Sequence, residues 1–147
     1  IVESSKIDSF AEIWENAQFG RKLLKQGKLI KNLRESFGKS SHLLLAYKNK
    51  KLLGGILVPT TKEIGYYMYA ATTDEGKKLF APTLLTWEAI KLAKRLGLKI
   101  FDFEGVYDER FPQKSWLGFS HFKKSFGGYE VRYPGAFIKT NFTSIIK

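Results

Sequence analysis

Residues 42–58 read HLLLAYKNKKLLGGILV, two apolar runs joined by a short cationic turn. The runs His42–Tyr47 and Leu52–Val58 flank the turn Lys48–Lys51, an arrangement typical of a β-hairpin. Pro59 follows directly and closes the second strand, because proline cannot donate a hydrogen bond to a sheet. This stretch therefore predicts two neighbouring antiparallel strands around which the other elements are placed.

Two helices are predicted before the hairpin. The first begins behind the capping residues Asp8 and Ser9 and ends at Gly20. The second covers Leu23 to Phe37, where apolar residues recur on one helical face. Both helices are amphipathic, so each is expected to pack one face against the sheet.

Strands and helices alternate after the hairpin. The predicted elements are a strand over Ile64–Ala71, a polar turn over Asp74–Phe80, a helix from Pro82 to Leu96, a short buried strand over Leu98–Phe103, a helix over Trp116–Phe126, and late strands over Tyr129–Tyr133 and Ala136–Ile138. Antiparallel strands followed by a strand–helix–strand crossover predict an α/β (α+β) fold with a mixed, mostly antiparallel sheet and helices on both faces. This order resembles the N-acetyltransferase (GNAT-like) architecture.

The composition fits a single folded domain over residues 1–147. Hydrophobic residues make up 44% of the chain and aromatic residues 15%, enough for one core. The absence of cysteine excludes disulfides, thiolate metal sites and a cysteine nucleophile. The net charge of +11 attracts polyanions such as nucleic acid or an anionic membrane face, although ordinary solubility explains such an excess equally well.

Location and processing are predicted from absent signals. No run approaches the ~18 apolar residues needed to cross a bilayer, and no signal-peptide pattern is present. We therefore expect a cytoplasmic protein. Because the chain opens at Ile1 and not at methionine, we expect it to be processed or to be part of a longer protein.

Three segments in the second half carry a family resemblance. They are YMYAATTDE (67–75) with APTLLTWEAI (81–90), FDFEGV (101–106), and FKKSFGGYEV (122–131) followed by YPG (133–135). In this order and spacing they resemble the FemABX family, the peptidyltransferases that build peptidoglycan cross-bridges. The resemblance extends from about Ile7 to Phe142.

The resemblance implies a function and its partners. Family members have two tandem GNAT-like domains and move an amino acid from aminoacyl-tRNA to an amino group of the stem peptide of a peptidoglycan precursor, either soluble or lipid-linked. No metal and no dissociable cofactor are required. The chain matches the second domain, so a first domain is expected in cis or in trans, and a peripheral contact with the membrane surface is a further candidate partner.

One departure from ordinary acetyltransferases supports this resemblance. Acetyl-CoA enzymes of this fold hold the pyrophosphate on a glycine-rich loop at the start of the main helix. Here the equivalent stretch Lys77–Pro82 has only Gly76 beside it, and Pro82 has no N–H to donate. An acyl carrier without that pyrophosphate, such as aminoacyl-tRNA, fits this loop better.

The resemblance places the first catalytic candidate at Lys123. Its ammonium would stabilise negative charge on a tetrahedral intermediate or on a phosphate. Phe122 would form a wall of the site, although phenylalanines at i and i+4 (Phe122 and Phe126) are also typical of a helix core. Lys124, in the same segment, is a substrate-binding candidate.

Further candidates lie on the predicted strands and on the Pro82 helix. Tyr69 is a catalytic candidate, and Tyr67 and Trp87 are substrate-binding candidates, since in this fold the tyrosine-rich strand edges the acyl site; strand propensity explains the tyrosines equally well. Asp102 and Glu104 alternate along the predicted strand, so both are expected on one face as candidate general bases, or as ion-pair partners of the abundant lysines.

The two histidines and the basic residues of the first half are further candidates for binding. His42 and His121 are too few for a typical zinc site, so no metal is expected. Basic residues recur at every third position around the second helix, a spacing that forms a spiral and not a single stripe. With the lysines of the hairpin turn they are candidates for contact with a tRNA backbone, although solvated surface explains each of them as well. They are Lys22, Lys25, Lys28, Lys31, Arg34, Lys48, Lys50 and Lys51.

Two other functions remain open from the sequence. The chain is alternatively an acyl-CoA-dependent N-acyltransferase of the same fold, which binding of CoA at the start of the Pro82 helix would reveal. It is alternatively a non-catalytic basic module that binds nucleic acid or a partner enzyme.

Overall fold

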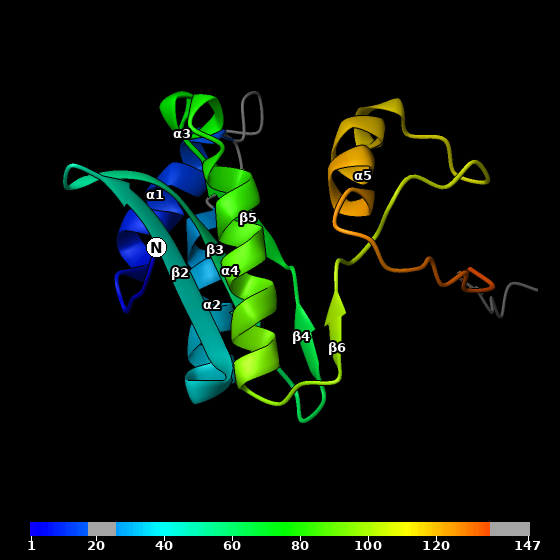
Figure 1. The fold of residues 1–147 in the computed structure, drawn as a ribbon, viewed down its shortest axis with the longest axis horizontal. Helices are drawn as coiled ribbons and strands as arrows, with labels where there is room; N and C mark the ends of the chain where they lie inside the picture. The colour runs from blue at the N-terminus through cyan, green and yellow to red at the C-terminus, as the bar shows by residue number, and fades with distance from the viewer. Residues whose placement is uncertain (18–25, 136–147) are drawn as a thin grey trace, which may run out of the picture. The chain divides into compact units, whose positions relative to one another are not determined.

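The computed structural model describes residues 1–17 and 26–135 (Figure 1). These residues belong to two compact units, 1–105 and 106–147, and each unit is described by itself. The expected end of the first helix at Gly20 and the expected start of the second at Leu23 lie outside the described residues, as does the expected strand Ala136–Ile138.

An antiparallel sheet of four strands forms the centre of unit 1–105. Its strands, in spatial order, are β1 (Val2–Glu3), β2 (Ser41–Lys48), β3 (Lys51–Pro59) and β5 (Tyr69–Thr72). Each neighbouring pair is antiparallel. The two-residue strand β1 was not predicted from the sequence.

The predicted hairpin is confirmed as the pair β2–β3. Leu44 lies opposite Ile56, and the register continues to the pair Ser41 and Pro59. The turn residues Asn49 and Lys50 both have positive φ, 48° and 67°, as a tight hairpin turn of the primed kind requires. The hairpin therefore supplies the two central strands of the sheet.

Helices cover both faces of this sheet, as the sequence predicted. Helices α1 (Ile7–Ala17) and α2 (Gln26–Phe37) lie on one face, and α4 (Ala81–Arg95) lies on the other (Figure 1). A short 3₁₀ turn, η1 (Gly38–Ser40), links α2 to β2. The helix predicted from Pro82 is thus confirmed, with the proline in its first turn.

The two faces of β2 and β3 supply two separate cores. The α1–α2 side buries Phe10, Ile30, Leu43, Leu45, Leu57 and Ala71. The α4 side buries Leu44, Ala46, Leu53, Ile56, Val58, Ala81, Leu85, Ala89 and Leu92. The alternation of Leu43, Leu44 and Leu45 between these cores is the period of a strand buried on both faces, which explains its continuous apolar run.

A close contact with α1 explains Gly55 on β3. A Cβ at this position would lie 2.7 Å from both Leu45 Cδ2 and Phe10 Cδ2. Those distances are shorter than van der Waals contact, so only glycine lets the Phe10 ring reach the sheet here.

The strand predicted over Ile64–Ala71 is wrong in its continuity. The chain forms β4 (Ile64–Tyr66) and then β5, with a break at Tyr67 and Met68. Strand β4 pairs in parallel with β6 (Ile100–Asp102) in a separate two-stranded sheet, whereas β5 pairs with β3. At the break, the Tyr67 N–H donates to the Asp102 carbonyl over 2.8 Å. The chain then passes from the sheet of β4 and β6 to the sheet that contains β3 and β5. Strand β6 is shorter and more exposed than the buried strand predicted over Leu98–Phe103.

The stretch predicted as a turn over Asp74–Phe80 contains the short helix α3 (Asp74–Lys78). Thr73 is its N-cap, and the Thr73 hydroxyl accepts a hydrogen bond from the Gly76 N–H over 3.0 Å. Two acidic residues in the first turn suit the positive end of the helix dipole. The prediction missed this helix because a five-residue helix is too short to show an apolar period.

Unit 106–147 is described to residue 135 and contains η2 (Lys114–Trp116) and α5 (Leu117–Lys124). The helix predicted over Trp116–Phe126 is thus confirmed over its central eight residues. The strand predicted over Tyr129–Tyr133 is wrong, because these residues have no strand pairing and their large side chains are exposed. Gly127 and Gly128 precede it with positive φ of 84° and 95°, a conformation outside the strand region.

Candidate functional site

A small cavity opens between β3, β5 and the first turns of α4. Its volume is about 70 Å³. Its lining combines aliphatic groups with hydroxyls, and consists of Gly55, Tyr67, Ala70, Ala71, Thr72, Pro82, Leu85 and Thr86. Of the residues singled out in the sequence, Tyr67 lines this cavity.

Tyr67 presents a protonated phenol at the cavity. Burial raises the pKa of the phenol above its ordinary value, and a hydrogen bond with the Thr86 hydroxyl opposes this by a smaller amount. The ring stacks on Phe103, with 5.7 Å between the ring centroids. The phenol is therefore held in place and keeps its proton at physiological pH.

Thr86 is a functional candidate that the sequence analysis missed. It is 1% exposed, and its hydroxyl donates to the Pro82 carbonyl over 2.9 Å. A threonine on the buried face of a helix, between Leu85 and Ala89, is the sequence signal that could have found it, because a buried hydroxyl requires a partner.

Tyr69 lies on the opposite face of the sheet from this cavity. Its ring meets Trp14 of α1 edge to face, with 5.1 Å between the centroids, and it packs against the α1–α2 core. Two residues of spacing put Tyr67 and Tyr69 on one face of an unbroken strand, but the break between β4 and β5 separates them. The structure therefore does not bring Tyr69 to the cavity.

Asp102 and Glu104 do not share a strand face, which corrects the sequence expectation. Strand β6 ends at Asp102, and Glu104 has a left-handed backbone with φ of 62°. The Asp102 carboxylate accepts the Glu104 N–H over 2.7 Å, so it caps the turn that leaves the strand. The Glu104 side chain is exposed.

Trp87 lies on α4 next to Thr86 but faces outward. It is 51% exposed and does not line the cavity. The start of α4 also departs from a phosphate-binding loop. Phe80 occupies the N-cap with φ of 56° and no side-chain cap, and Pro82 removes one of the free N–H groups of the first turn.

The remaining candidates lie on α5 in unit 106–147. The Lys123 ammonium is 4.9 Å from the centre of the Phe119 ring, a cation–π geometry. Phe122 and Phe126 contact each other edge to face at 5.2 Å, as their spacing of four predicts. Lys124 pairs with Glu130 at 2.5 Å, so its charge is partly compensated.

Ser120 and Arg110 make polar contacts near α5 that were not predicted from the sequence. Ser120 is 4% exposed; its hydroxyl donates to the Trp116 carbonyl and accepts the Tyr107 N–H, each over 2.7 Å. Arg110 pairs with Asp108 and holds the pKa of that carboxyl at about 2. The contact of Ser120 with Tyr107 joins the loop after residue 105 to α5, and the Arg110–Asp108 pair lies within that loop.

The eight candidates therefore divide between the two units. Unit 1–105 holds Tyr67, Tyr69, Trp87, Asp102 and Glu104, and unit 106–147 holds Phe122, Lys123 and Lys124. The structure brings Tyr67 together with Thr86, and Lys123 together with Phe119.

Two of the basic residues predicted as a spiral are tied to neighbouring backbone or carboxylate groups. Lys31 pairs with Asp8, and Arg34 donates to the carbonyls of Ser4 and Ser41. Lys22 and Lys25 lie outside the described residues. His42 contacts the Glu3 carboxylate across β1 and β2 at 2.7 Å, a contact between strands, and His121 is exposed on α5.

Residues 1–17 and 26–135 contain neither a metal-binding cluster nor a membrane-spanning helix. No cluster of three or more histidine or acidic side chains there is arranged to hold a metal ion. Within the same residues, every helix is too short or too polar to span a membrane.

Solved structures define the class of fold. An aminoglycoside antibiotic 6'-N-acetyltransferase from Acinetobacter haemolyticus is 16% identical, with a TM-score of 0.65 over 95% of this chain and 97% of its own. A possible acetyltransferase from Clostridium difficile 630 is 12% identical, with a TM-score of 0.70 and 95% of each chain covered. A ribosomal-protein-alanine N-acetyltransferase from Brucella melitensis biovar Abortus 2308 is 9% identical, with a TM-score of 0.62 over 91% of this chain and 93% of its own. The chain has the GNAT acyltransferase fold.

The sequence also matches a family model. The model of the FemAB family matches residues 4–141, and the chain belongs to that family. No curated protein matches the sequence. Family and fold together support an acyltransferase-type enzyme.

Proposed function

We propose that the chain is the acyl-transfer domain of an aminoacyltransferase. It would move an amino acid from aminoacyl-tRNA to an amino group on the stem peptide of a peptidoglycan precursor. The observation that carries the proposal is the match to the FemAB family over residues 4–141. Since charged tRNA is a cytoplasmic reagent, the proposal places the reaction in the cytoplasm.

The chemistry of the proposed reaction requires little of the protein. The neutral amine of the acceptor attacks the carbonyl carbon of the aminoacyl ester, and a tetrahedral intermediate with a negatively charged oxygen forms. The bond to the ribose oxygen then breaks, and the proton lost by the amine is transferred to that ribose oxygen. The protein must position the two groups and stabilise the oxyanion.

Each unit holds one described candidate for contact with the acyl group. The Lys123 ammonium supplies a positive charge on α5, and the Tyr67 phenol is a neutral hydrogen-bond donor whose raised pKa keeps its proton. Lys123 is our candidate for charge stabilisation, and Tyr67 is our candidate for binding the acyl carbonyl. Phe122, Lys124 and Trp87 remain candidates for substrate binding. Tyr69, Asp102 and Glu104 are weaker candidates, because Tyr69 packs into the α1–α2 core and Asp102 caps a turn.

The start of α4 supports a carrier without a pyrophosphate. Its first turn has a left-handed phenylalanine at the N-cap and a proline without an N–H, where a pyrophosphate site requires successive free N–H groups. We therefore favour aminoacyl-tRNA as donor. The FemAB resemblance also implies a first domain, in cis or in trans, as part of the acceptor-binding groove.

An acyl-CoA-dependent N-acyltransferase is the second candidate, because several similar solved structures are described as acetyltransferases. The two candidates differ in donor. Equilibrium binding of CoA, with charged tRNA tested in parallel, separates them: saturable CoA binding that is lost in a Thr83→Pro variant, which removes an N–H from the first turn of α4, would favour the second.

An aminoacyl-transfer assay that compares the wild-type chain with single-residue variants tests the proposal. A mixture of charged tRNAs is incubated with a muramyl-pentapeptide and the wild-type chain, the Lys123→Ala variant, or the control Lys114→Ala, which removes an exposed lysine of the same unit. We expect transfer to fall about 100-fold in Lys123→Ala, the usual scale for losing one oxyanion-stabilising group, and to persist in Lys114→Ala.

Other outcomes have defined meanings. If the chain binds charged tRNA or the precursor without transfer, the first domain is required, and the assay is repeated with that domain supplied. If the chain neither binds nor transfers either substrate, the proposed function is wrong.

A further inference from the structure

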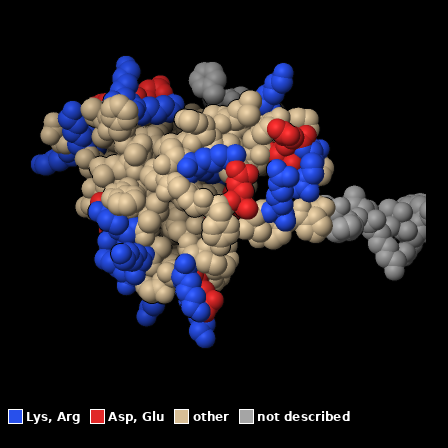
Figure 2. Space-filling view, turned by 45° about the vertical axis from the view of Figure 1, so that its right-hand side comes forward, with Lys and Arg blue, Asp and Glu red and all other residues tan. Residues whose placement is uncertain are grey.

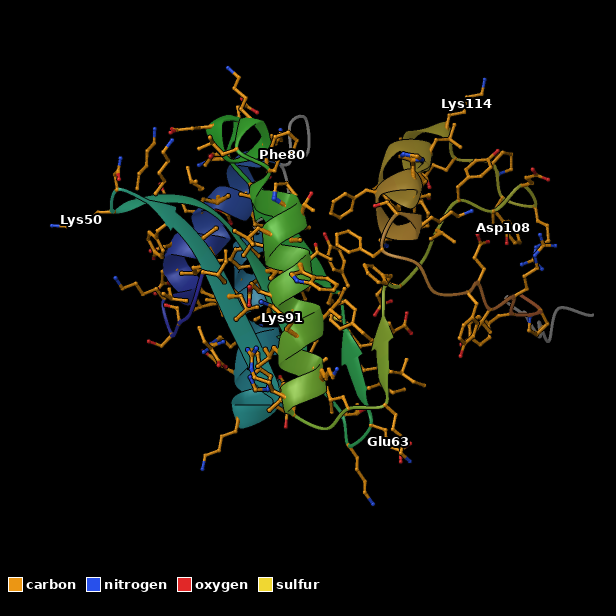
Figure 3. The ribbon with its side chains drawn as sticks, viewed as in Figure 1. Lys50, Glu63, Phe80, Lys91, Asp108 and Lys114 are labelled. Atoms are coloured by element: carbon orange, nitrogen blue, oxygen red, sulfur yellow. The ribbon has the colours of Figure 1, made fainter. Side chains whose placement is uncertain are left out.

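A surface that combines lysines with exposed apolar side chains lies at one end of unit 1–105. It is formed by the tip of the β2–β3 hairpin, by α3 and by the start of α4 (Figure 1). We call it the hairpin–α3 surface, and its members are Lys48, Lys50, Lys51, Lys77, Lys78, Leu79, Phe80 and Leu84. Figure 3 shows Lys50 and Phe80 toward this end of the unit and Glu63 toward the opposite end.

The lysines of this surface come together from two separate segments. Lys51 on the hairpin pairs with Glu75 on α3 at 2.6 Å. Lys48 and Lys78 are also close enough to lower the pKa of the Glu75 carboxyl, behind the larger effects of the Lys51 contact. Residues 48–51 and 74–80 together carry five lysines and two carboxylates, a net charge of +3. Figure 2 shows Lys and Arg side chains spread over the face that it draws, with Asp and Glu side chains beside several of them.

The apolar members project from the same end. Phe80 is 75% exposed, and Leu79 and Leu84 are 40% and 49% exposed. Phe80 has a left-handed backbone with φ of 56°, a conformation that a bulky residue adopts only when its surroundings impose it. Leu84 and Trp87 follow Phe80 at i+4 and i+7, on the side of α4 that is not buried against the sheet.

This surface is held in a fixed shape. Thr73 donates to the Leu53 carbonyl of β3 from both its N–H and its hydroxyl, over 2.8 and 3.2 Å. Gly76 lies so close to β3 that a Cβ would be 2.4 Å from the same carbonyl oxygen. Helix α3 is thus fixed on β3, and the lysines and Phe80 are presented by a rigid scaffold.

Lysines around exposed aliphatic and aromatic side chains match the surface of an anionic bilayer. Lysines bind the negative headgroup layer, and Phe and Leu enter the boundary between headgroups and acyl chains. Nucleic acid fits less well, because these segments contain lysine and no arginine, and two of the three exposed apolar side chains are leucines, which cannot stack on bases.

We infer that the hairpin–α3 surface docks the chain on an anionic lipid membrane, with Phe80 and Leu84 inserted at the interface. This goes beyond the proposed function, since it concerns residues other than Lys123 and Tyr67. It requires neither tRNA nor acyl transfer.

Vesicle binding tests the inference with no substrate present. The chain is sedimented with vesicles of phosphatidylcholine alone and with vesicles that also contain phosphatidylglycerol, at low and at high salt. We expect partition onto the anionic vesicles only, weakened by salt. Because one lysine near such a surface changes partition about fivefold, the double variant Lys50→Gln/Lys78→Gln should bind about 25-fold more weakly. These two lysines are chosen because the Lys51–Glu75 and Lys77–Asp74 pairs remain intact.

A separate variant tests the exposed apolar side chains of the hairpin–α3 surface. Phe80→Ser should weaken partition about fivefold, since its side chain would be only partly buried in the interface. The matched controls lie at the other end of the unit. They are Lys62→Gln, beside Glu63, and Leu96→Ser, which removes a leucine just after α4 that is about as exposed (45%) as Leu84 (49%); neither should change partition.

Three results would overturn the inference. The first is equal binding to neutral and anionic vesicles. The second is partition that the control variants reduce as much as the test variants do. The third is absence of binding to the anionic vesicles. If a tRNA without its amino acid then binds, and Lys50→Gln/Lys78→Gln weakens that binding, the surface is a nucleic-acid contact. Circular dichroism of each variant confirms that it is folded.

Discussion

Replacing Gly76 by alanine tests how α3 is held on the sheet. The new Cβ would lie 2.4 Å from the Leu53 carbonyl oxygen and 3.2 Å from its carbon. An ordinary contact between carbon and oxygen is longer, so α3 must move away from β3. The same carbonyl accepts both hydrogen bonds from Thr73, and both would be lengthened by this movement.

The expected cost follows from those two bonds. Losing both bonds costs about 2–3 kcal/mol, at about 1–1.5 kcal/mol each, and the better helix propensity of alanine returns about 0.8 kcal/mol. We therefore expect Gly76→Ala to lower the free energy of unfolding by about 1–2 kcal/mol, or Tm by roughly 2–8 °C for a chain of this size.

Thermal and urea unfolding measure this change, with Gly118→Ala as the matched control. Gly118 is also a helical glycine, but nothing lies within 4 Å of a Cβ built there, so its alanine variant should be neutral or more stable. A Gly76→Ala variant at least as stable as the wild type would refute the account of how α3 is positioned.

Two further predictions concern pH. The pKa of Tyr67 is raised by burial, so its contribution to stability is complete below the ordinary value of 10.0 and is lost as pH rises beyond it. Urea unfolding should show a smaller alkaline loss in Tyr67→Phe than in Tyr129→Phe, which removes an 86% exposed tyrosine; equal losses would contradict this. Arg110 holds the pKa of Asp108 at about 2, so the pair contributes stability above the ordinary value of 3.8 and loses it as pH falls toward 2. In Arg110→Gln, carboxyl NMR should show the Asp108 midpoint rising toward 3.8, and an unchanged midpoint would exclude the pair as the cause.

Elements with a strong apolar period could be predicted from the sequence. The hairpin over residues 42–58 and the helix from Pro82 are both found, because an apolar run with a polar turn and a proline in a first helical turn are local signals. The break between β4 and β5 could not be predicted. It arises because Ile64–Tyr66 pairs with β6 whereas Tyr69–Thr72 pairs with β3, and both pairings depend on residues distant in sequence.

The same reason limits prediction of the candidate site. The contact of Phe122 with Phe126 follows from helical spacing alone. The shared face of Asp102 and Glu104 was wrong because Glu104 adopts a left-handed backbone, which no local signal marks in a residue other than glycine. The contact of Tyr67 with Thr86 joins two elements and required the structure.

The identity of the acyl donor tests the central claim most directly. The chain, together with a first domain if one is required, is given a muramyl-pentapeptide and either a mixture of charged tRNAs or acetyl-CoA, and the product is weighed by mass spectrometry. We expect a gain of one aminoacyl residue with charged tRNA, none with acetyl-CoA, and loss of the product in Lys123→Ala. An acetylated product, or aminoacyl transfer that Lys123→Ala leaves unchanged, would contradict it.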